Sequence, residues 1–190
     1  EFLIGGTGFA NYTKKAPVKK MNSWVQNVDL SGSNGLAVFD RHSGEKLWQV
    51  KANYSFLHNC IVAGEGKIYL LDRLPSTFES KLKRRGKSLP DQYRLLCLDL
   101  KTGKELWSNT EGIFGTWLGY SKQYDVLIQG TSKARDRSSM EAAMGMVAYQ
   151  GKNGKVLWQD LKRKYAGPMM IHNETIITNV EGRSEERRVG

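Results

Sequence analysis

Three stretches of the chain repeat one pattern of apolar and polar positions. Each begins with an apolar run, turns at a polar segment that contains glycine, and leaves through Leu-Trp, at residues 36–48, 95–107 and 146–158. Apolar or alternating runs on both sides of a short glycine-containing turn predict a β-hairpin. An internal repeat of this kind indicates an array of similar units rather than one irregular domain.

The turn residues of the three copies have an identifiable chemistry. An aspartate at the start of a turn can accept hydrogen bonds from backbone amides further along, and a glycine later in the turn supplies the left-handed conformation. The aspartates are Asp40 and Asp99, and the glycines are Gly44, Gly103 and Gly154. Gln150 replaces the aspartate in the third copy, which predicts a turn that is held less firmly.

One tryptophan closes each copy at the same position, and these residues are Trp48, Trp107 and Trp158. A large aromatic surface with a single N–H suits packing between neighbouring units. We therefore expect these side chains to be structural rather than to stack on a planar cofactor.

Two further apolar runs follow each tryptophan, so each unit is predicted to contain four antiparallel strands. The units span about residues 35–73, 94–131 and 145–180, and the insertions 8–34, 74–93 and 132–145 precede the hairpins. The opening Phe2-Leu-Ile-Gly-Gly-Thr7 matches residues 126–131, so residues 2–7 are expected to form the last strand of a preceding blade. The chain is accordingly expected to be a piece of a longer protein.

Repeated four-stranded units are typical of a β-propeller, a ring of about four to eight such blades. The predicted fold class is all-β, a partial β-propeller of about three four-stranded antiparallel blades in an incomplete ring, covering residues 1–182. The last segment, residues 183–190, resembles a translated sequencing adapter and is expected to be a non-native tail outside any blade.

The motif Asp99-Leu-Lys-Thr-Gly-Lys-Glu-Leu-Trp107 resembles the repeat family named after pyrroloquinoline quinone (PQQ). This resemblance implies one of two kinds of protein. Quinoprotein dehydrogenases hold PQQ and calcium in such a propeller, whereas outer-membrane assembly lipoproteins and scaffolds use it to bind proteins. The fold alone does not separate the two.

The enzyme hypothesis can be compared with individual residues. Dehydrogenases that resemble this family carry a vicinal cysteine pair, but Cys60 and Cys97 lie in separate predicted strands. No residues here match the family's calcium ligands or its aspartate base, so no catalytic, cofactor-binding or metal-binding residues are assigned. The favoured function is a non-catalytic protein-binding or scaffold module. The alternative is a fragment of a PQQ-dependent quinoprotein dehydrogenase that oxidises alcohols or sugars.

Charge provides a separate indication of a partner. The chain has 29 Lys and Arg against 19 Asp and Glu, a net charge of +10, and most of the excess lies in the three insertions. An anionic partner would be a membrane surface, an acidic polysaccharide or an acidic protein, whereas a solvated loop needs no partner. Nucleic acid is not favoured, because no nucleic-acid motif accompanies the charge. The candidate binding rim comprises Trp24, Lys81, Lys83, Arg84, Arg85 and Lys87.

The chain contains no apolar run of about 18 residues, the length that a membrane-spanning helix requires. The resemblance implies a bacterial, exported protein in the periplasm or at the cell surface.

Overall fold

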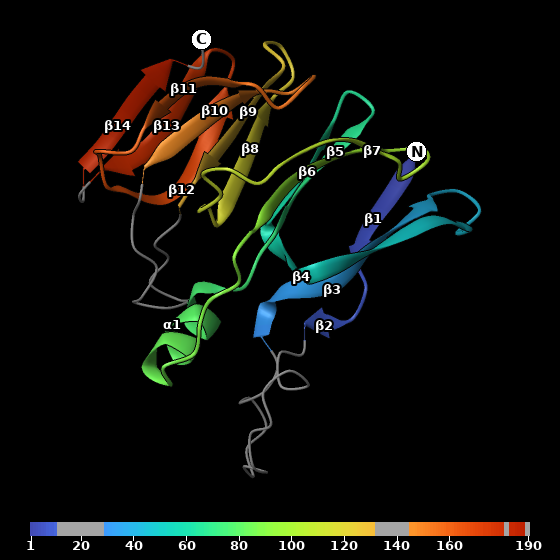
Figure 1. Ribbon diagram of the computed structural model, residues 1–190. Coiled ribbons are helices and arrows are strands. Elements are labelled where there is room, and N and C mark those ends of the chain that lie inside the picture. The colour runs from blue at the N-terminus through green and yellow to red at the C-terminus, as the bar shows by residue number, and fades with distance from the viewer. Residues whose placement is uncertain (11–28, 132–144, 181–182, 189–190) are drawn as a thin grey trace.

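A computed structural model describes residues 1–10, 29–131, 145–180 and 183–188. Nearly all regular structure is β, with one helix in the described part of the chain (Figure 1). The elements are β1 (Phe2–Gly6), β2 (Phe9–Ala10), β3 (Asp29–Asp40), β4 (Lys46–Gly64), β5 (Lys67–Asp72), α1 (Ser76–Arg84), β6 (Arg94–Asp99), β7 (Glu105–Asn109), β8 (Trp117–Ser121), β9 (Val126–Gly130), β10 (Met146–Gln150), β11 (Val156–Asp160), β12 (Tyr165–His172), β13 (Thr175–Val180) and β14 (Arg183–Arg188).

The strands form three antiparallel sheets, which make up the successive blades of an open, partial β-propeller, with two blades in the first sheet (Figure 1). The first has the order β1-β3-β4-β5-β6-β7, with β2 paired to β3, the second β11-β10-β9-β8, and the third β12-β13-β14. The long strand β4 joins two blades, because Val50 pairs with Leu36 of β3 and Ala63 pairs with Ile68 of β5. The predicted all-β, propeller-type fold class is confirmed.

The sheets and the sequence repeats are out of phase by two strands. Ile68 pairs with Leu98 and Ile128 pairs with Ala148, so the last two strands of one repeat lie beside the first two strands of the next. The expected units 94–131 and 145–180 therefore each contribute to two sheets, whereas the unit 35–73 lies within the first sheet and its strand β4 joins two blades there. The physical reason is that β5–β6 and β9–β10 are neighbouring antiparallel pairs, whereas the chain passes to a new sheet between β7 and β8.

The predicted insertions consequently connect neighbouring strands within a sheet. They join β1 to β3, β5 to β6 and β9 to β10, and thus all emerge at the same end of the sheets. Strand β1 pairs with β3 as β9 pairs with β10, which gives residues 2–6 the same place in their sheet. Of the insertion at residues 74–93, nine residues fold as α1.

Helix α1 follows from the local sequence. Phe78 and Leu82 are one helical turn apart and pack beside Leu74, while Glu79 lies in the first turn and basic residues lie in the last. Gly86 then adopts φ 63°, and the amide of Lys87 donates to the carbonyl of Leu82 at 3.0 Å. This described helix is too short to cross a bilayer.

Three apolar clusters hold successive blades face to face. The first includes Leu36, Ile68 and Leu98, the second Tyr69, Cys97, Leu127 and Tyr149, and the third Ile128, Met146, Tyr165 and Ile176. Neighbouring residues of β5 therefore face opposite ways, Ile68 toward the preceding blade and Tyr69 toward the following one. A blade buried on both faces explains why these strands are continuous apolar runs.

The final segment differs from its expected place outside any blade. Residues 183–188 form β14, which pairs with β13 from Val180↔Arg183 to Thr175↔Arg188. The ladder bonds join backbone groups, so a strand of charged residues can occupy a free sheet edge. The adapter origin of residues 183–190 concerns the nucleotide sequence and stays a prediction.

Candidate functional site

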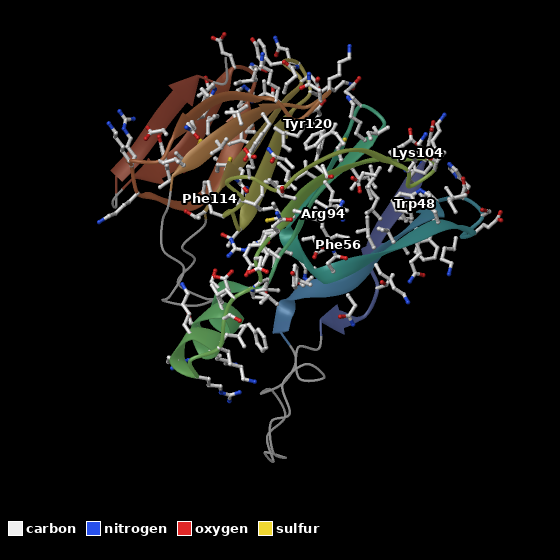
Figure 2. All side chains as sticks on the ribbon, in the orientation of Figure 1. Trp48, Phe56, Arg94, Lys104, Phe114 and Tyr120 are labelled. Atoms are coloured by element: carbon white, nitrogen blue, oxygen red, sulfur yellow. The ribbon has the colours of Figure 1, made fainter. Side chains whose placement is uncertain are left out.

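The repeat signature residues meet at the junction between successive copies. The indole Nε1 of Trp48 donates a 2.9 Å hydrogen bond to the carbonyl of Leu100, and its ring lies against Gly103 (Figure 2). The indole Nε1 of Trp107 likewise donates to the carbonyl of Gly151 at 3.0 Å, and its ring lies against Gly154. Each tryptophan thus docks on the turn of the next copy. Trp158 is half-buried beside the third apolar cluster.

The two turn aspartates bind their own turns. Asp40 accepts hydrogen bonds from the amides of His42 and Ser43 at 2.9 and 2.8 Å, and from the Ser43 hydroxyl at 3.1 Å. Asp99 accepts from the amides of Lys101 and Thr102 at 3.1 and 2.8 Å, and from the Thr102 hydroxyl at 2.7 Å. These bonds lower the pKa of both carboxyls, mainly through Ser43 for Asp40 and Thr102 for Asp99.

The turn of the third copy, where Gln150 replaces the aspartate, is hydrogen-bonded to a residue of another turn, Asp125. The side-chain amide Nε2 of Gln150 donates to a carboxylate oxygen of Asp125 at 3.2 Å and to the backbone carbonyl of Asp125 at 3.3 Å. Asp125 comes from the turn between β8 and β9, has φ 50°, accepts from the Tyr120 hydroxyl at 2.7 Å and pairs with Lys67 at 3.6 Å. Burial opposes ionisation of Asp125, but the bonds from Tyr120 and Gln150 outweigh it and lower its pKa.

This arrangement joins three successive copies at Gly151. The Gly151 carbonyl accepts from both Trp107 and the Tyr69 hydroxyl, the latter at 3.2 Å, and a Cβ at Gly151 would lie 2.3 Å from the Asp125 carboxylate. Sequence analysis did not identify Tyr69, Tyr120 or Asp125. The replacement of aspartate by Gln150 was the one available signal.

The candidate binding rim is described only in part. Lys81, Lys83, Arg84, Arg85 and Lys87 lie on α1 and the turn after it, and all five are exposed. Trp24 lies outside the described residues. The structure therefore groups the basic residues on one element and does not test their connection to Trp24.

A buried ion pair fixes α1 against the sheets. Arg73 pairs with Glu79 at 2.7 Å, and their side chains are 6% and 15% exposed. Glu79 also accepts from the Tyr93 hydroxyl at 2.6 Å, and burial, together with this hydrogen bond, raises the pKa of that phenol. Arg73 further donates to the carbonyls of Phe114 and Gly115, in the connection between β7 and β8.

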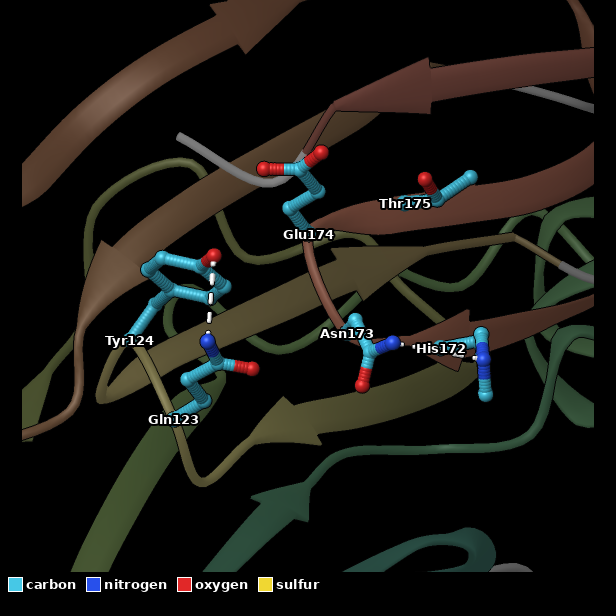
Figure 3. Close-up of a pocket in the computed structure, with 6 residues that line it drawn as sticks. All are labelled: Gln123, Tyr124, His172, Asn173, Glu174 and Thr175. Carbon is cyan, nitrogen blue, oxygen red and sulfur yellow. Dashed lines mark hydrogen bonds between the residues drawn. The ribbon is translucent and has the colours of Figure 1, made fainter.

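A polar cavity of about 420 Å³ lies between the β8–β9 turn and the β12–β13 turn (Figure 3). These turns are at the end of the sheets opposite to α1. The Gln123 amide donates to the Tyr124 hydroxyl at 3.3 Å, and the Asn173 amide lies 3.4 Å from Nε2 of His172. The set can hydrogen-bond a small polar molecule. Its lining residues are Gln123, Tyr124, His172, Asn173, Glu174 and Thr175.

Both cysteines are buried and neither forms a disulfide, with Cys60 in β4 and Cys97 in β6. Burial raises the pKa of the Cys97 thiol to about 12. Within the described ranges, no three His, Cys, Asp or Glu side chains gather as ligands for a metal ion.

The blades and their interlocking turns define the class of protein as a partial β-propeller of PQQ-like repeats. The chain belongs to the family whose model is described as outer membrane protein assembly factor BamB, which matches residues 17–170. No curated protein sequence matches the chain.

Solved structures with a similar fold come from both kinds of propeller. BamB from Moraxella catarrhalis has a TM-score of 0.53 at 13% identity, over 83% of this chain and 42% of that one. The quinohemoprotein alcohol dehydrogenase ADHIIG from Pseudomonas putida HK5 has a TM-score of 0.51 at 12% identity, over 86% and 34%. The computationally designed Ika8 protein has a TM-score of 0.56 at 11% identity, over 83% and 41%. The chain thus spans less than half the length of each.

Proposed function

We propose that this chain belongs to a non-catalytic propeller that acts as a protein-binding scaffold in outer membrane protein assembly, in the periplasm or at the cell surface. The observation that carries the proposal is the family match over residues 17–170. The solved BamB structure supports the fold of such a scaffold.

The chemistry of the repeat motif is consistent with this role. The indoles of Trp48 and Trp107 contact Gly103 and Gly154, so those surfaces are occupied by protein. One carboxylate oxygen of Asp99, Oδ1, accepts hydrogen bonds from two amides and a hydroxyl of its own turn. These contacts give the tryptophans and the turn aspartate a structural role in the propeller, which supports the scaffold proposal.

The alternative, a quinoprotein dehydrogenase, predicts a different result in a direct titration. The intact protein would be titrated with PQQ and calcium while quinone absorbance is followed, and then assayed for dye reduction with alcohols and sugars. We expect neither stoichiometric binding nor turnover. Stoichiometric PQQ binding with turnover would overturn the scaffold proposal.

The assembly role needs a test of its own. Deletion of the gene in its source organism should lower the amount of folded outer-membrane barrel proteins, measured by their heat-modifiable migration on gels. The wild-type gene should restore that amount. Unchanged barrel levels after deletion would contradict a role in assembly.

A further inference from the structure

We propose that the exposed side of α1 and the turn after it dock on an anionic lipid membrane. We name this surface the basic helix face, defined by Lys81, Lys83, Arg84, Arg85 and Lys87. The inference does not depend on which protein the propeller binds, because it rests on the charge and position of α1 alone.

The charge of the basic helix face is not neutralised nearby. None of its five cations forms an ion pair within the described part of the chain. Glu79, the one carboxylate of α1, is directed inward, where it binds Arg73 at 2.7 Å and the Tyr93 hydroxyl at 2.6 Å. The outward side of the helix therefore presents positive charge alone.

The basic helix face is also rigidly attached. Phe78 and Leu82 pack with Leu74, Tyr54 and Tyr93 in a separate apolar cluster beneath the helix. The Arg73 guanidinium lies 5.0 Å from the centroid of the Tyr93 ring and ties this cluster to the next blade. Lys81, Lys83 and Arg84 thus lie on a helix that is packed on the protein, and Arg85 and Lys87 lie on the turn that follows it. This packed position differs from the solvated loop that the sequence left open.

The shape of this region favours a membrane over a peptide. In Figure 1, α1 projects from one end of the sheets, at the opposite end from the polar cavity. A projecting array of lysine and arginine side chains can approach a flat, diffusely charged surface, where each cation adds to the electrostatic attraction. Because the apolar side of α1 already packs on the protein, docking would rely on charge without insertion, and salt should weaken it.

The test is co-sedimentation of the intact protein with vesicles of phosphatidylglycerol and phosphatidylcholine. The variant Lys83→Glu/Arg84→Glu/Arg85→Glu is compared with Lys104→Glu/Lys152→Glu/Lys155→Glu, an equal charge change on exposed turns at the other end of the sheets. Each cation near an anionic surface contributes about fivefold in affinity, so the α1 variant, which lacks three of them, should bind about a hundredfold more weakly. The control variant should bind nearly as wild type does.

Three outcomes would overturn the proposal. They are equal vesicle binding by wild type and the α1 variant, an equal loss in both variants, and binding to soluble polyglutamate without binding to vesicles. The last result would indicate an acidic protein as the partner. Circular dichroism and the neutral variant Lys83→Gln/Arg84→Gln/Arg85→Gln separate lost charge from lost structure, since the neutral variant should keep the fold and still lose binding.

Discussion

The indole of Trp48 occupies the space that a side chain on Gly103 would need, because a Cβ at Gly103 would lie 2.6 Å from Cδ2 and Cε3 of the ring. Trp107 and Gly154 have the same relationship, with a corresponding distance of 2.7 Å to Cε3. The glycine of each of these turns therefore has two functions. It permits a positive φ, and it leaves room for the tryptophan of the preceding copy.

Alanine substitutions can separate these two functions. Gly44, Gly103 and Gly154 have φ values of 73°, 71° and 73°, but Gly44 has nothing within 4 Å of the Cβ position. We expect Gly44→Ala to lower the free energy of unfolding by about 1–2 kcal/mol, because alanine disfavours the left-handed backbone conformation. Gly103→Ala and Gly154→Ala should each lower the free energy of unfolding by about 1–3 kcal/mol more than Gly44→Ala does, because the added methyl group displaces the indole. Urea unfolding would measure the difference, and equal losses for all three variants would contradict the docking argument.

The Gly151 carbonyl offers a test of how successive copies are coupled. It accepts hydrogen bonds from Trp107 Nε1 at 3.0 Å and from the Tyr69 hydroxyl at 3.2 Å. Either Trp107→Phe or Tyr69→Phe leaves one donor, whereas the double variant leaves neither of these two. An unsatisfied buried carbonyl costs about 1–3 kcal/mol, so the double variant should lose more stability than the sum of the single variants. A strictly additive double-mutant cycle would show that the shared acceptor is unimportant.

The lowered pKa values of Asp40 and Asp99 predict a specific acid response. Because the folded-state pKa lies below the unfolded value, both groups stabilise the fold above their ordinary pKa of about 4. That stabilisation is lost as the pH falls through the folded-state pKa. Asp40→Asn and Asp99→Asn should therefore reduce the fall in melting temperature between about pH 5 and pH 2. An acid response as in wild type for both variants would contradict this role of the turn aspartates.

The buried cysteines should be chemically inert in the native state. Both are 0% exposed, and burial raises the pKa of Cys97 to about 12, which leaves almost no thiolate at pH 8. Cys60→Ser and Cys97→Ser should therefore not change the number of native thiols that react with Ellman's reagent. Each substitution should remove one thiol from the count after denaturation. A native thiol lost in either variant would show that the strand is open to solvent.

The sequence was sufficient for the repeat, the strand content and the propeller class, since these depend on local periodicity and on turn residues such as Asp99 and Gly103. It did not reveal the phase of the blades, because strand partners such as Ile68 and Leu98 are separated by an insertion and only tertiary pairing decides between them. The charge of α1 was evident from its lysines and arginines. The inward direction of Glu79 was not, because it depends on the distant Arg73 and Tyr93 side chains.

The Arg73–Glu79 ion pair should stabilise the fold more than the exposed ion pairs do, since its side chains are 6% and 15% exposed. Glu79→Ala would leave a buried guanidinium without its carboxylate and should cost about 3 kcal/mol. The matched control is Lys122→Ala, because Lys122 pairs with Glu65 at 2.9 Å while 79% exposed, and a surface pair that water screens contributes little to stability. Arg73→Met/Glu79→Leu removes both charges and should recover part of the loss. Equal stability of Glu79→Ala and Lys122→Ala in urea unfolding would mean that water reaches Arg73 and that the pair does not hold α1 in place.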